Sequence, residues 1–163
     1  MSESIDAFEA GNITVKSLMD KAYTAARQSY SPYSAFAVGA ALLLKDGSVI
    51  TGTNFENASY GLTLCAETVA VATANAAGHL ADIRAIAICG GKFDKDRFIG
   101  KDIIYPCGRC RQVLNEAAEI GDYDIMVYCG SAEGSEIESH RLSTLLPHSF
   151  GPKNLNIPSP KKD

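Results

Sequence analysis

Apolar residues recur at helical intervals in three stretches of the chain. In residues 14–29 they lie three and four positions apart, which predicts an amphipathic helix with Thr14 as its N-cap. Residues 66–77 are nearly all apolar and end at a glycine, so a buried helix is expected there. A third helix is predicted for residues 107–120, where Pro106 precedes the helix and a glycine follows it.

Shorter apolar runs predict the strands. They lie at residues 38–44, 49–54, 83–89 and 125–129, and residues 137–140 are expected to form a short last strand. Asp46 and Gly47 separate the first two runs, and this dipeptide is typical of the tight turn of a β-hairpin. The later runs alternate with helices, which favours an α/β fold: a three-layer α/β/α sandwich around a five-stranded mixed sheet. Residues 90–105 are expected to form a long connection, and connections of that length tend to be functional.

Length and composition indicate one ordinary globular domain. The chain has 163 residues, 46% of them apolar, and residues 1–163 are predicted to form a single domain with flexible ends at 1–12 and 153–163. The net charge of −4 and the dispersed Lys and Arg argue against nucleic-acid binding, because phosphate neutralisation needs clustered positive charge. No apolar run is long enough for a membrane span, and the acidic N-terminus is unlike a signal peptide. A small-molecule ligand and a cytoplasmic location are therefore expected.

The spacing of the cysteines indicates a metal-binding site. The chain has five cysteines, an odd count that fits metal binding or catalysis better than a disulfide framework. Cys107 and Cys110 form a Cys-x-x-Cys pair at the start of one predicted helix, and Cys65 lies at the start of another. Helix N-termini stabilise thiolates, and three thiolates leave one tetrahedral position on Zn²⁺ open for water. Glu67, two residues from Cys65, can reach the same cavity as a proton carrier without being a ligand.

The combined pattern matches the signature of zinc deaminases, a ligand-x-Glu followed by Pro-Cys-x-x-Cys. Two other interpretations stay open at this point. A structural zinc site would need a fourth ligand, for which the candidates are Cys89, Cys129 and His79. A redox pair would use the Cys-Gly-Arg-Cys sequence alone, and would leave Cys65 and Glu67 without a role.

Further stretches resemble the small homotetrameric class of cytidine deaminases. They are SPYS (31–34) with Phe36, VGAAL (38–42), NFENASYG (54–61), CAE (65–67), PCGRCRQ (106–112), LLP (145–147) and FGP (150–152). The resemblance implies hydrolytic deamination of cytidine or deoxycytidine to the uridine product and ammonia, with one zinc ion per subunit. It also implies a homotetramer with no nucleic-acid or membrane partner.

The same resemblance implies roles for the residues around the substrate. Phe36 would pack beside the pyrimidine ring, and the Ala66 backbone would read the edge of the base. Asn54 and Glu56 would bind the ribose hydroxyls. The resemblance also implies that Tyr60 and Phe150 reach into the substrate site of a neighbouring subunit.

The chain departs from the common family pattern at Thr68, where most members carry an arginine that offsets the thiolate charge. We expect Arg109, inside the Cys-x-x-Cys pair, to replace it, with Arg111 as the alternative. The same exchange resembles blasticidin S deaminases, which keeps a modified cytosine nucleoside open as the substrate. The stretch 54–61 favours an ordinary cytosine nucleoside. A binding or sensor protein would need the acid–base residue to be missing, and Glu67 is present.

Overall fold

A computed structural model describes residues 13–158 of the chain. The helices and strands are α1 (Val15–Ala26), β1 (Ala37–Leu44), β2 (Val49–Thr53), α2 (Ala66–Ala76), β3 (Ile83–Asp94), β4 (Arg97–Ile99), α3 (Gly108–Gly121), β5 (Met126–Ser131), β6 (Ile137–Arg141) and α4 (Leu142–Leu145). Three 3₁₀ turns join them, η1 (Tyr60–Leu62), η2 (Leu80–Asp82) and η3 (Pro152–Leu155). None of the described helices is long and apolar enough to cross a membrane.

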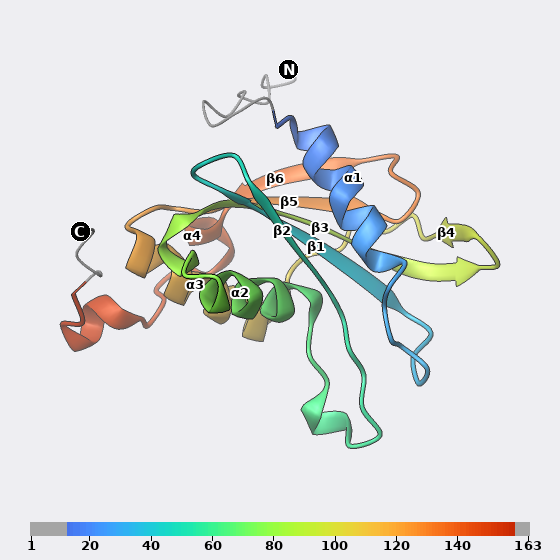
Figure 1. Ribbon diagram of the computed structural model, residues 1–163, viewed down its shortest axis with the longest axis horizontal. Helices are drawn as coiled ribbons and strands as arrows, with labels where there is room; N and C mark the ends of the chain where they lie inside the picture. Colours follow the sequence, from blue (N-terminus) through green and yellow to red (C-terminus); the bar gives the residue numbers. More distant parts are fainter. Residues whose placement is uncertain (1–12, 159–163) are drawn as a thin grey trace.

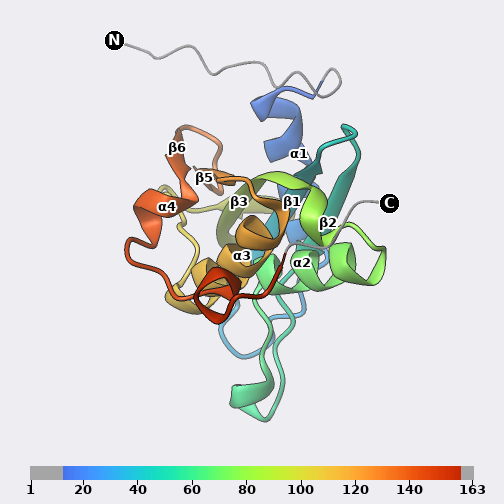
Figure 2. The same cartoon turned by 90° about the vertical axis from the view of Figure 1, so that its left-hand side faces the viewer.

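The main sheet has the strand order β2-β1-β3-β5-β6. β1 pairs antiparallel with both β2 and β3, β3 runs parallel to β5, and β6 returns antiparallel to β5. Helix α1 covers one face, and α2 and α3 cover the other (Figures 1 and 2). The predicted three-layer α/β/α sandwich with a mixed sheet is confirmed.

Two apolar clusters fill the spaces between the layers. Along β1, Ala40, Leu42 and Leu44 belong to the cluster beneath α2 and α3, whereas Ala41 and Leu43 belong to the cluster beneath α1. Successive side chains of a strand point to opposite faces, so a continuous apolar run fills both layers at once. The unbroken apolar run of β1 therefore reflects a strand buried on both faces.

Two glycines set how closely the helices approach the sheet. A Cβ placed on Gly39 of β1 would lie 1.9 Å from the carbonyl oxygen of Ala22 in α1. A Cβ on Gly52 of β2 would lie 2.5 Å from the carbonyl oxygen of Ala66 in α2. Both helices therefore pack against sheet backbone without an intervening side chain, which holds the start of α2 directly against the end of β2.

The expected long connection at residues 90–105 is wrong for its first half, and the strand count of five is wrong with it. β3 continues to Asp94, and β4 folds back on it with Phe93 opposite Phe98, so a sixth strand forms. The turn places Lys95 at φ 55° and is closed by a hydrogen bond from Arg97 to Asp94. Such turns favour Gly or Asn, so the residues here gave no turn signal.

Hydrogen bonds hold both ends of the described part of the chain. Thr14 caps α1 as predicted, through a hydrogen bond from the Ser17 N–H to its hydroxyl, which is 3.1 Å long. The segment from Lys153, expected to be flexible, begins with η3, in which the Lys153 N–H donates to Glu119 at 2.9 Å. Residues 1–12 and 159–163, the remaining parts of the two ends expected to be flexible, lie outside the described residues.

Candidate metal centre and active site

The three predicted ligands come together at the starts of two helices. Cys65 is the N-cap of α2 and Cys107 is the N-cap of α3, with Cys110 in the first turn of α3. Their sulfur atoms all lie within 4.8 Å of one another. Strands β2, β3 and β5 run in one direction, so their carboxyl ends share one edge of the sheet, and α2 and α3 both begin there. The topology itself thus brings cysteines from residues 65 and 107–110 into one group.

The sulfur group fits a zinc ion. Tetrahedral zinc with Zn–S bonds of about 2.3 Å places its sulfurs about 3.8 Å apart. This separation is compatible with the three sulfur atoms, which all lie within 4.8 Å of one another. Among residues 13–158, no fourth His, Cys, Asp or Glu joins the group. Three sulfur ligands leave a position for water, as a catalytic zinc site needs.

Hydrogen bonds among the three cysteine side chains shift the pKa values of Cys65 and Cys110. Hydrogen bonding from Cys110 and then Cys107 lowers the pKa of Cys65 to about 6, and the positive charge of Arg109 adds to that effect. Contact with Cys65, together with burial, raises the pKa of Cys110. Neighbouring thiolates repel one another, and a divalent cation bound among them removes that penalty. The electrostatics therefore favour a bound cation.

Glu67 is the acidic residue nearest this chemistry. It lies in the first turn of α2 and is only 4% exposed. Burial raises the pKa of its carboxyl group, and the negative charge of Cys65 raises it further. A carboxyl group whose pKa moves toward neutral pH can both accept and release a proton during a reaction.

Thr68 and Arg109 lie beside different sulfur ligands. The Thr68 hydroxyl is 3.7 Å from the sulfur of Cys110. Arg109 is exposed, and its guanidinium donates to the Thr63 carbonyl at 3.5 Å while its charge acts on Cys65. Arg111 instead donates to the backbone carbonyls of Pro106 and Leu145, at 2.8 and 2.9 Å. Arg111 therefore anchors the start of α3.

Asn54 and Glu56 follow β2 and are both 8% exposed. The Asn54 side-chain oxygen accepts from the Val38 N–H at 2.9 Å and from Ser29 at 2.6 Å, and its amide donates to the Phe36 carbonyl at 2.9 Å. One amide N–H of Asn54 has no hydrogen-bond partner among the described residues. The two side chains are thus held rigidly at the sheet edge where α2 begins.

Glu56 is bonded as fully as Asn54. Its carboxylate accepts from the Ser34 hydroxyl and from the Tyr33 N–H, the latter at 2.9 Å. These hydrogen bonds, with Ser34 the largest contributor, hold the pKa of Glu56 below its usual value. Glu56 is therefore a fixed carboxylate, and carboxylates are strong acceptors for hydroxyl groups.

Phe36 lies beside the segment that leads to Cys107, and Ala66 directly follows Cys65. A Cβ on Gly90 would lie 3.1 Å from the Phe36 ring and 3.2 Å from Ile104, which precedes the Cys107 loop. Ala66 is fully buried and is the first residue of α2. Its N–H is one of those at a helix start that have no acceptor within the helix.

Tyr60 and Phe150 differ from the other predicted residues because their rings face outward. Tyr60 is 74% exposed, and Phe150 is 61% exposed. Tyr60 begins η1, on a loop that projects from the body of the molecule (Figures 1 and 2). The Phe150 backbone is fixed by a hydrogen bond from Gln112 to its carbonyl at 2.8 Å. The structure does not bring either ring into contact with the sulfur group.

The residues considered for other zinc or redox arrangements lie elsewhere. Cys89 and Cys129 are fully buried in β3 and β5, and burial raises the pKa of each thiol to about 12. His79 contacts Asp82 at 3.1 Å. Neither thiol and no histidine therefore completes a closed four-ligand site among the described residues.

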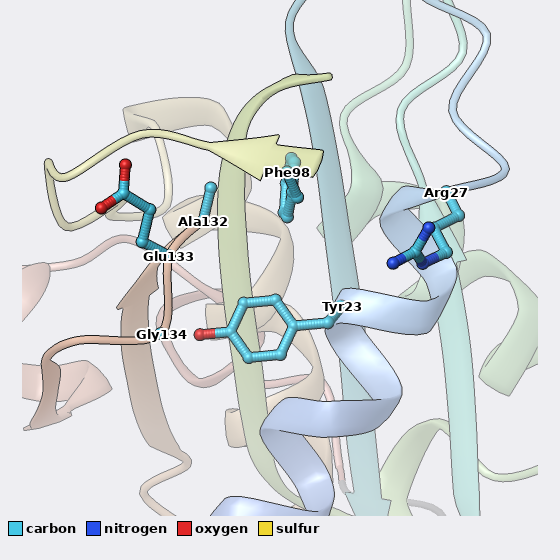
Figure 3. A pocket seen from close by; sticks show the side chains of 6 residues that line it. All are labelled: Tyr23, Arg27, Phe98, Ala132, Glu133 and Gly134. Atoms are coloured by element: carbon cyan, nitrogen blue, oxygen red, sulfur yellow. The ribbon is translucent and has the colours of Figure 1, made fainter. Parts of the chain in front are cut away.

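A hollow of about 210 Å³ lies on the other side of the sheet, beside α1. Figure 3 shows its lining of Tyr23, Arg27, Phe98, Ala132, Glu133 and Gly134, with the Tyr23 hydroxyl pointing toward Gly134. The Tyr23 hydroxyl donates to the Ser131 carbonyl at 2.9 Å. The hollow is smaller than most small-molecule sites and shares no residue with the sulfur group.

Sequence reasoning did not identify two serines that position the predicted binding residues. Ser29 donates to Asn54, and Ser34 donates to Glu56. Ser29 precedes the stretch 31–34 and Ser34 ends it, so the signal available was the cluster of small polar residues itself. Their partners lie more than 20 residues away along the chain, which spacing alone does not predict.

Three thiolates at two helix starts, with a buried carboxyl group beside them, define a zinc-dependent hydrolase of the deaminase type. The family model for the cytidine and deoxycytidylate deaminase zinc-binding region matches residues 13–127. A cytidine deaminase of Halalkalibacterium halodurans is 45% identical over 139 residues, which cover 85% of this chain and 96% of the relative. A cytidine deaminase of Mycobacterium tuberculosis is 41% identical, with coverage of 85% and 90%.

A solved structure agrees with these relatives. The crystal structure of cytidine deaminase from Burkholderia pseudomallei matches with a TM-score of 0.70 at 38% identity, covering 85% of this chain and all of the other. This chain therefore belongs to the cytidine and deoxycytidylate deaminase family, and zinc is its cofactor.

Proposed function

We propose that this protein hydrolyses the amino group of cytidine, deoxycytidine or both, which yields uridine or deoxyuridine and ammonia for pyrimidine salvage. The observation that carries the proposal is the buried Glu67 carboxyl group beside the sulfur group of Cys65, Cys107 and Cys110. Family membership and relatives that are cytidine deaminases support the same reaction. A structural zinc site or a redox pair would leave Glu67 buried without a purpose.

Glu67 moves the protons in this mechanism. Cys65, Cys107 and Cys110 would hold a zinc ion, which would lower the pKa of a water molecule that acts as the nucleophile. Glu67 accepts a proton from that water and delivers it to ring N3, which makes C4 electrophilic. After attack at C4, Glu67 accepts the remaining proton of the attacking oxygen and passes it to the amino group. Ammonia then leaves with the C4–N bonding electron pair, and the C4 carbonyl of the product forms. General acid–base help of this kind contributes on the order of 10²–10⁴-fold in rate.

The remaining pocket residues would select a nucleoside. Glu56 offers a fixed carboxylate and Asn54 one amide N–H, which suit the donor and acceptor character of ribose hydroxyls. The Phe36 ring supplies an apolar face for the base, and the Ala66 N–H at the start of α2 supplies a donor for its edge.

The proposal includes a homotetramer in which subunits share sites. Tyr60 and Phe150 expose most of their rings in the single chain, although large aromatic groups gain free energy when buried. Contact with a neighbouring subunit's pocket would bury them. Tyr60 and Phe150 would then complete the binding site of another copy.

We assign Arg109 to the offset of thiolate charge, because its positive charge favours the Cys65 thiolate. A cytoplasmic location belongs to the same proposal. All five cysteines are free, and the three ligands have to stay reduced to bind zinc.

An assay of the purified protein with cytidine, deoxycytidine and blasticidin S tests the proposal. Ammonia release and loss of absorbance are followed together, alongside the zinc content of the same sample. We expect turnover of cytidine or deoxycytidine with one zinc per chain. Turnover of blasticidin S alone would assign the protein to the modified-nucleoside alternative, and a zinc-loaded protein inactive on all three would refute deamination.

A further inference from the structure

The Thr68 hydroxyl lies against a metal ligand. Its oxygen is 3.7 Å from the Cys110 sulfur, a distance at which the large sulfur atom accepts a hydrogen bond. Cys110 is fully buried, so solvent does not reach its sulfur. A direct protein donor is then the available way to stabilise charge on that atom.

Thr68 behaves differently from Thr24 of α1 and Thr73 of α2. Thr24 and Thr73 both donate to the carbonyl four residues earlier, at 2.9 and 2.8 Å. The equivalent carbonyl for Thr68 is that of Leu64, and it already accepts the Phe55 N–H at 2.9 Å. The Thr68 hydroxyl turns to the sulfur instead, so this contact is not the ordinary default of a helical threonine.

Hydrogen bonding to a zinc-bound thiolate withdraws charge from the sulfur. Three thiolates on one Zn²⁺ give a net charge of −1, and groups around a metal site commonly adjust such charge. Arg109 acts on Cys65 from the exposed side, whereas Thr68 contacts Cys110 from the interior. The two residues therefore reach different ligands.

We propose that Thr68 is a positioning residue that donates its hydroxyl hydrogen to the zinc-bound thiolate of Cys110 and so tunes the metal site. Offset of the thiolate charge is then divided between Thr68 and Arg109 and does not rest on one arginine. This inference rests on the proposed function only in so far as the three cysteines hold a metal ion.

The test compares Thr68→Val, which keeps the shape and removes the hydroxyl, with Thr68→Ser, which keeps the hydroxyl. Thr73→Val is the matched control, because it removes a hydroxyl from the same helix that bonds only to the Val69 carbonyl. Each variant is loaded with zinc for release to a chelator, and separately with Co²⁺ for its sulfur-to-cobalt absorption band. Circular dichroism establishes that each variant is folded.

We expect T68V to release zinc about 10-fold faster, at the lower end of the loss typical for groups that support metal ligands. Its cobalt band should move to lower energy, because a thiolate without the hydrogen bond donates electrons more readily. T68S and T73V should match the wild type in both measurements. Equal behaviour of T68V and the wild type, or equal shifts in T68V and T68S, would overturn the inference.

Neither readout uses a nucleoside, so failure of this inference is separable from failure of the deamination proposal. If T68V does not fold, Thr68→Ala serves in its place with the same expected shifts. If the wild type deaminates cytidine and the cobalt band of T68V does not move, the proposed function stands and the role of Thr68 is refuted. If the cobalt band of T68V moves but the wild type does not deaminate cytidine, the role of Thr68 stands and the proposed function is refuted.

Discussion

The pKa of Glu67 depends on two opposing features of its position. Burial at 4% exposure disfavours the charged carboxylate and raises the pKa. A place in the first turn of α2 favours negative charge, since the helix N-terminus carries partial positive charge. Burial, the largest effect, together with the negative charge of Cys65 outweighs the effects that lower the pKa of Glu67, so the net shift is upward. A single residue thus combines a fixed position with a proton affinity suited to transfer.

At the same scale, Arg109→Gln should weaken zinc retention. The substitution removes the positive charge that lowers the pKa of Cys65, so the thiolate becomes harder to form. Because Arg109 is exposed, salt screens the effect, and the loss should shrink as ionic strength rises. Zinc release to a chelator at two salt concentrations measures this.

Arg97→Gln provides the control for Arg109, since it makes the same change of charge on β4. It should leave zinc release unchanged at either salt concentration. Identical release from R109Q and the wild type at low salt would contradict the role assigned to Arg109.

The metal ligands could be predicted from residue spacing, but their partners could not. Cys107 and Cys110 are one turn apart, and a helix start favours thiolates wherever it lies, so local rules suffice. Which side chain meets the Cys110 sulfur depends on how α2 packs beside α3. That packing follows from close contacts such as Gly52 against Ala66, which no local pattern encodes.

Among the elements, the contact between α1 and β1 is the most demanding. The position of Gly39 beneath α1 leaves no room for a methyl group, because the neighbouring atoms are helix backbone. Gly39→Ala should therefore destabilise the fold by about 3 kcal/mol or more, the upper end of the usual cost of overpacking. The urea midpoint at fixed protein concentration measures the change.

Gly61→Ala is the matched control, because a Cβ there meets nothing within 4 Å. Its urea midpoint should stay within the range of ordinary surface substitutions, about 0.5 kcal/mol in free energy of unfolding. Equal midpoints for G39A and G61A would show that α1 does not pack on β1 as closely as described.

Helices were easier to predict than the β3–β4 hairpin. Residues 66–77 carry an apolar pattern long enough to favour a helix over a strand, and α2 has nearly the same bounds. The hairpin has short strands, and its turn uses Lys95 in a left-handed conformation that favours other residues. Stacking of Phe93 on Phe98, at 4.6 Å between ring centroids, stabilises the hairpin through tertiary contact.

At the scale of the whole molecule, several exposed aromatic rings are groups that the proposed homotetramer would bury. Tyr60, Tyr33 and Tyr30 are among them, with exposures of 74%, 49% and 54%. If Phe150 completes a neighbour's site, two defective variants should rescue each other when they share an oligomer. Co-expression of Glu67→Gln with Phe150→Ala tests this.

A site built from the Glu67 of one variant and the Phe150 of the other is intact, so random mixing should give about a quarter of wild-type activity. Each variant alone should be strongly impaired. Activity no greater than the sum of the separate variants would show that Phe150 acts within its own subunit or has no role.

The central claim is that Glu67 moves the protons of a zinc-dependent deamination. The most direct measurement is the turnover number of Glu67→Gln on cytidine or deoxycytidine, with its zinc content determined in the same sample. We predict one zinc per chain, unchanged folding, and a turnover number lower by on the order of 10²–10⁴-fold, because the amide can neither accept nor release the proton. A zinc-loaded E67Q variant that keeps substantial turnover would contradict it.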